Sequence, residues 1–123
     1  MPRQPRLYNP DWHLGRLVKF YVLGYPLLSD ALIKWADDNQ IAPDTTWNNR
    51  RHLAWRGICQ SLPQDCRRWA LVNTDAGALA HCVVVATNDS PEDMKRAEDL
   101  EMVRTVQKVV SVYTPPKWYK RVL

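Results

Sequence analysis

One segment of the chain, residues 45–62, gathers side chains that can form hydrogen bonds to the edges of nucleic-acid bases. At 100° per residue these side chains fall on one side of a helix, at spacings of three and four. They are Asn49, His52, Arg56 and Gln60. Amide, imidazole and guanidinium groups suit the hydrogen-bonding pattern of a DNA major groove. The segment therefore predicts a nucleic-acid-reading helix, and the alternative is an ordinary polar helix face turned to solvent.

Further cations lie near both ends of this predicted helix. Arg50 and Arg51 lie near its start, while Arg67 and Arg68 follow its end. Guanidinium groups in such positions neutralise backbone phosphates and orient a reading helix. We therefore include Arg50, Arg67 and Arg68 in the candidate nucleic-acid surface, the last two as auxiliary contacts.

Charge is unevenly spread along the sequence. The chain has 123 residues and a net charge of +4, with bases concentrated in residues 1–20, in residues 44–68 and at the C-terminal end. Residues 89–108 are instead mildly acidic. This distribution favours an anionic partner. The alternative is a basic protein whose charge serves no partner.

Histidine, cysteine and acidic residues are present, but their spacing does not match a metal site or a catalytic motif. His81 and Cys82 are neighbours in a predicted strand, so their side chains point to opposite faces and are poorly placed to share one ion. Cys59 and Cys82 stand among apolar residues, as small buried side chains do. The glycines are scattered, which excludes a phosphate-binding loop. We predict no metal, no cofactor and no catalytic residue, and keep as an alternative a small enzyme whose site assembles from distant residues.

The elements that would position these residues are mainly helical. Helices are expected at about 9–24, 29–40 and 45–62, a β-hairpin at 68–72 and 78–85, and a last helix at 91–112. Pro91 after Ser90 is a strong helix start. The predicted class is α+β, mainly helical, in the order α-α-α-β-β-α. This order resembles that of winged-helix domains, in which the third helix enters the major groove and the hairpin contacts the backbone.

The expected domain organisation is one globular domain with two basic ends. Residues 1–8 form a flexible basic arm, residues 9–114 the domain, and residues 115–123 a basic aromatic tail. Trp118 and Tyr119, set between cations, are candidates for binding a partner. The apolar stripe of the predicted helix 91–112 is a candidate dimer contact. A homodimeric adaptor module without catalytic activity is therefore the main alternative to nucleic-acid binding.

The sequence also carries signs of its compartment. The first residues lack the apolar core of a secretory signal, and no apolar run is long enough to cross a membrane. Three cysteines are an odd number and too few for a disulfide scaffold. We expect an intracellular protein without a membrane partner, in either the cytoplasm or the nucleus.

Overall fold

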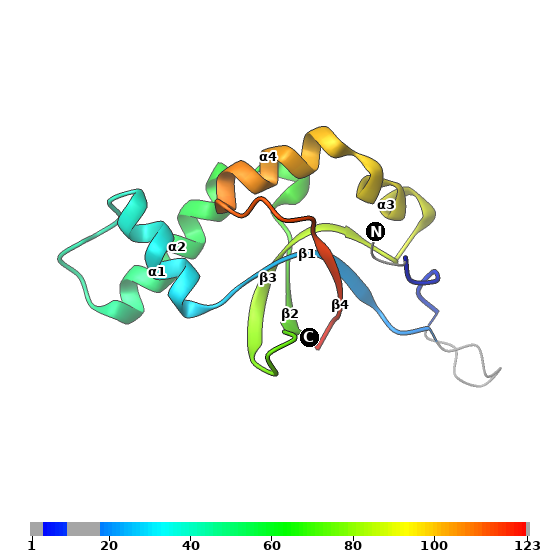
Figure 1. The fold of residues 1–123 in the computed structure, drawn as a ribbon, viewed down its shortest axis with the longest axis horizontal. Helices are drawn as coiled ribbons and strands as arrows, with labels where there is room; N and C mark the ends of the chain where they lie inside the picture. The colour runs from blue at the N-terminus through cyan, green and yellow to red at the C-terminus, as the bar shows by residue number, and fades with distance from the viewer. Residues whose placement is uncertain (1–3, 10–17, 123) are drawn as a thin grey trace.

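The computed structural model describes residues 4–9 and 18–122, and its elements follow the order β-α-α-β-β-α-β. The strands are β1 (Tyr21–Leu27), β2 (Trp69–Asn73), β3 (Leu79–Thr87) and β4 (Lys117–Lys120). The helices are α1 (Ser29–Asp38), α2 (Trp47–Ser61), α3 (Pro91–Lys95) and α4 (Leu100–Val110), with 3-10 turns η1 (Gln64–Cys66) and η2 (Arg96–Glu98). In Figure 1, α1 and α2 lie at one end of a curled sheet and α4 runs across it.

The four strands form one antiparallel sheet in the order β2-β3-β1-β4. Strand β1 lies inside the sheet, paired with β3 on one side and β4 on the other. Its apolar sequence suits a strand covered on both faces. At Gly24 the β1–β3 register shifts, and a Cβ at this position would lie 1.9 Å from the carbonyl oxygen of Val83. The close approach of these strands therefore requires glycine there.

The two outer strands meet where the sheet curls. Val72 of β2 forms an isolated antiparallel bridge with Arg121, and the backbone N–H of Val122 donates to the carbonyl of Leu71 at 2.7 Å. The curl encloses a small apolar cluster around Val72 and Cys82, made by strand residues together with Phe20. The ends of β2 and β4 are therefore not free sheet edges.

The other face of the sheet carries the main core. Ala54 and Ile58 of α2 and Val106 of α4 are buried there, in the same cluster as sheet residues such as Val83. Trp35 of α1 donates from its indole nitrogen to the carbonyl of Val109 in α4 at 2.7 Å. The helices are thus fixed against the sheet and against one another.

The predicted mainly helical order α-α-α-β-β-α is wrong, and the winged-helix resemblance is wrong with it. The helix expected at 9–24 ends in the segment that forms β1, while residues 10–17 lie outside the described part. A continuous apolar run fits either a buried helix or a buried strand, and here the pairing with β3 and β4 decides for the strand. The fold is α+β around a four-stranded antiparallel sheet.

The last predicted helix also differs from the structure. Residues 91–112 contain α3, η2 and α4, because Asp99 begins a new helix by accepting a hydrogen bond from the backbone N–H of Met102 at 3.1 Å. Helices at 29–40 and 45–62 and the hairpin at 68–85 are confirmed as α1, α2 and β2–β3. Within residues 4–9 and 18–122, no helix has the length and apolarity needed to cross a bilayer.

Candidate nucleic-acid interface

Helix α2 presents the candidate surface, and local chemistry defines both of its ends. Thr46 caps the N-terminus, its hydroxyl oxygen accepting from the backbone N–H of Asn49 at 3.3 Å. At the other end, the Arg67 guanidinium donates to the carbonyls of Leu62 and Gln60 at 3.1 and 3.3 Å. The helix sequence contains arginines but no carboxylate. Its own charge is therefore entirely positive.

The four predicted base-reading residues lie together on the outside of α2. Asn49, His52, Arg56 and Gln60 are all exposed, and we call them the polar strip. Among the described residues, none of these side chains takes part in a hydrogen bond or an ion pair. The molecule's own fold leaves the strip open to a ligand.

The other three predicted arginines are engaged within the fold. Arg50 forms an ion pair with Asp37 and donates to the carbonyl of Ile41. Arg67 holds the end of α2, as described above. Arg68 binds both carboxylate oxygens of Asp93, at 2.7 and 3.1 Å, and donates to the carbonyl of Val85. All three guanidinium groups already bind groups of the protein itself. The polar strip therefore makes up most of the candidate surface that is open to a ligand.

Arg51 differs from these three arginines. Its guanidinium donates to the hydroxyl of Ser29 at 3.1 Å and lies over the ring of Trp47, 5.3 Å from the centroid. Both partners are uncharged. Arg51 is thus held in place with its positive charge uncompensated by any carboxylate in the described structure.

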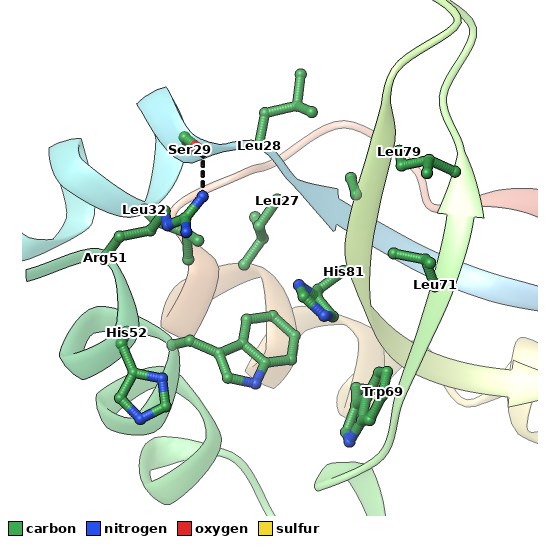
Figure 2. A pocket seen from close by; sticks show the side chains of 12 residues that line it. Leu27, Leu28, Ser29, Leu32, Arg51, His52, Trp69, Leu71, Leu79 and His81 are labelled. Atoms are coloured by element: carbon green, nitrogen blue, oxygen red, sulfur yellow. Dashed lines mark hydrogen bonds between the residues drawn. The ribbon is translucent and has the colours of Figure 1, made fainter. Parts of the chain in front are cut away.

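A hollow of about 470 Å³ adjoins the polar strip, between α2 and the β2–β3 hairpin. We call it the hairpin hollow. Figure 2 shows Arg51 reaching Ser29 on one side of it and His81 projecting from β3 toward α2 on the other. It is lined by Leu27, Leu28, Ser29, Leu32, Arg51, His52, Trp55, Trp69, Leu71, Leu79, Ala80 and His81. No carboxylate is among these residues, and His52 belongs to both the hollow and the strip.

Aromatic rings make one wall of the hairpin hollow. The His81 ring lies between two indoles, with centroids 5.5 Å from Trp55 and 5.2 Å from Trp69. Trp69 is 58% exposed and Leu79 is 56% exposed, although both belong to strands. The helix-facing side of the hairpin therefore extends beyond α2 and leaves apolar surface open to solvent.

Sequence reasoning named His52 and Arg51 but missed the hollow and the rest of its lining, including Trp69 and His81. The available signal was composition, because six tryptophans against one phenylalanine imply that some indoles stay partly exposed. Alternation along β2 and β3 also places Trp69, Leu71, Leu79 and His81 on one face. Only the tertiary packing shows that α2 covers this face in part, with Trp55 against His81 and with Trp69 and Leu79 left exposed.

The residues predicted to bind a partner lie in β4. Trp118 and Tyr119 are half-buried and pack on opposite faces of the sheet, Trp118 against the main core and Tyr119 against the smaller cluster. Both residues also pair with β1. Packing within the molecule accounts for much of their surface.

The remaining chemistry of the described residues is sparse. They contain no group of three or more His, Cys, Asp or Glu side chains able to hold a metal ion. Burial raises the pKa of the Cys59 and Cys66 thiols, and raises that of Cys82 to about 12. These thiols are therefore mostly protonated near neutral pH, which makes them weak nucleophiles.

Comparisons with protein-family models, with curated proteins and with solved structures found no match. The surface of α2 and the hairpin hollow are therefore the features of this protein that bear on its function.

Proposed function

We propose that this protein binds nucleic acid through the exposed surface of α2. The observation that carries the proposal is the polar strip, four hydrogen-bonding side chains left open on a helix that bears arginines and no carboxylate. Arg56 and Gln60 supply bidentate donors and acceptors for base edges. Arg51 supplies a fixed positive charge beside them.

The proposal requires a strong dependence of affinity on salt. Cations that neutralise phosphates release counterions, so the affinity falls steeply as salt rises. The test is fluorescence anisotropy of labelled random-sequence duplex and single strand, each titrated at about 50 and 200 mM salt. Binding by either probe with a steep salt slope supports the proposal.

A matched pair of variants assigns the binding to α2. Arg56→Ala removes an exposed arginine from the polar strip and should weaken binding about fivefold or more. Arg104→Ala removes another exposed arginine, in α4 and away from the strip, and should leave affinity within about twofold. Equal affinities for the wild type and Arg56→Ala would assign any binding to another surface.

The adaptor alternative gives a different result in the same experiments. An adaptor shows no salt-dependent binding to either oligonucleotide. A dimeric mass by light scattering, together with no oligonucleotide binding, would favour self-association over nucleic-acid binding as the function. Leu100 of α4 is 64% exposed and is the first candidate for a contact between two copies.

An intracellular location is part of the proposal. Cys59, Cys66 and Cys82 are free thiols in the structure, as expected in a reducing compartment. Nothing in this observation separates cytoplasm from nucleus. Imaging of a fluorescent fusion tests it, and secretion of the fusion would contradict it.

A further inference from the structure

We infer that the hairpin hollow receives one unpaired base of a nucleic-acid strand, so that the preferred ligand is single-stranded. The inference rests on the proposed function and names its substrate class. The hollow shares His52 with the polar strip, so a strand lying along α2 passes directly over it. A base within a duplex is stacked between its neighbours and cannot enter, whereas an unpaired base can.

The shape and chemistry of the wall suit a flat ring. Trp55, His81 and Trp69 form a row of neighbouring rings, with centroids 5.5 and 5.2 Å apart and ring planes tilted by 41° and 72°. The Trp69 indole is mostly exposed and therefore offers a face for stacking. Proteins that bind single strands commonly stack bases on aromatic side chains in this way. At about 470 Å³ the hollow lies within the size range of small-ligand sites.

Charge selects an anionic ligand over a purely apolar one. Arg51 lies on the rim, is oriented by Ser29 and Trp47, and has no carboxylate partner. A guanidinium fixed in this way can bind a phosphate with two hydrogen bonds and little loss of side-chain freedom. A second copy of this chain docking by an apolar face would leave that charge buried and unpaired. A base with its attached phosphate satisfies both the ring and the cation.

The test compares oligo(dT) with a duplex of equal length, using the intact protein. We expect tighter binding to the single strand, with quenching of tryptophan fluorescence on saturation. Trp69→Ala should weaken single-strand binding about tenfold or more, because the stacking face is lost. Trp69→Phe keeps an aromatic ring and should stay within about threefold of the wild type. Tyr113→Ala removes a 69% exposed aromatic ring elsewhere and serves as the control.

The outcomes separate this inference from the proposed function. Because Trp69 is mostly exposed, its removal should leave the far-ultraviolet circular dichroism and thermal midpoint near those of the wild type. Single-strand binding unchanged in Trp69→Ala, or a preference for duplex, overturns the inference and leaves nucleic-acid binding by α2 in place. Binding of neither oligonucleotide overturns both. Saturable quenching by an acidic, tyrosine-containing peptide but by no oligonucleotide would reassign the hollow to a protein partner.

Discussion

Arg50 Nη2 lies 2.7 Å from Asp37 Oδ1, whereas the next residue, Arg51, has no acidic partner among the described residues. Adjacent positions on a helix are separated by 100°, which turns Arg50 toward Asp37 near the end of α1 and Arg51 toward Ser29 at its start, on the rim of the hairpin hollow. Two neighbouring arginines therefore have different environments. Arg50 forms an ion pair with α1, whereas Arg51 donates to an uncharged hydroxyl of α1 and keeps an uncompensated charge at the rim of the hollow.

These two arginines form a matched pair for mutagenesis. Arg51→Ala should leave the free energy of unfolding within about 0.5 kcal/mol, since only a hydrogen bond to Ser29 and a ring contact are lost at the surface. It should weaken nucleic-acid binding and reduce the salt slope by about one. Arg50→Ala should cost about 1 kcal/mol of stability and leave the salt slope unchanged. Urea titrations and anisotropy would measure both, and the reverse pattern would contradict the assignment.

The Arg68–Asp93 pair predicts how stability depends on pH. Burial alone would raise the pKa of the Asp93 carboxyl, but hydrogen bonds from Arg68 and Thr87 and the charge of Arg96 outweigh it and lower the pKa below 3.8. A lowered pKa in the folded state stabilises the protein above the ordinary aspartate value of about 3.9. This contribution is lost as the pH falls through the folded pKa. The unfolding free energy should therefore fall as the pH is lowered from about 5 toward 2.

Asp93→Asn tests the source of that pH dependence. The amide cannot accept both hydrogen bonds from the Arg68 guanidinium, so the free energy of unfolding should fall by about 2–3 kcal/mol at pH 7. This loss is at or just below the usual range for a buried ion pair, because the Arg68 side chain is 34% exposed. Its stability should also vary less with pH in the acid range. Asp99→Asn, which keeps a side-chain cap on α4, is the control. An unchanged acid profile in Asp93→Asn would place the titrating group elsewhere.

Local sequence signals were sufficient to predict the helices and the hairpin that they border. Ser90 before Pro91 predicted a helix start, and Thr46 caps α2 in the same way, since each hydroxyl accepts a hydrogen bond from a backbone N–H three residues later. The Gly-containing loop between β2 and β3 predicted the hairpin. The polar strip was likewise predictable, because a helical period fixes which side chains share a face. In each case the deciding interactions lie within a few residues.

Long-range pairing could not be predicted in the same way. The apolar segment of β1 became a strand because β3 and β4, about sixty and ninety-five residues later, pair with it. The four residues of β4 resemble a peptide tail until that partner is known. The hairpin hollow depends on how α2 packs beside the hairpin, which no periodicity encodes. The element order was therefore mispredicted and the hairpin hollow missed for the same physical reason.

Gly24 should be among the positions least tolerant of substitution, because β1 and β3 meet most closely there. A Cβ would lie 1.9 Å from the Val83 carbonyl oxygen and 2.9 Å from Cys82 Sγ. Gly24→Ala should cost about 3 kcal/mol or more, since a backbone atom must move. Gly77→Ala is the control, where the added methyl meets nothing within 4 Å and the cost comes only from a φ of +81°. The free energy of unfolding of Gly77→Ala should fall by about 1–2 kcal/mol, measured by thermal or urea unfolding. Equal losses in Gly24→Ala and Gly77→Ala would contradict the close approach of β1 and β3.

The stability of β4 variants tests whether Trp118 and Tyr119 stabilise the fold or bind a partner. Trp118 packs against the main core and Tyr119 against the sheet cluster around Val72, so each covers one face of the curled sheet. Alanine at either position should lower the unfolding free energy by about 2 kcal/mol, less than for a fully buried ring because both are half-buried. Lys117→Ala, at a side chain 64% exposed, should change it by about 0.5 kcal/mol at most. Unchanged stability in Trp118→Ala would mean that the strand holds without this ring, and would return Trp118 to the role of a docking residue.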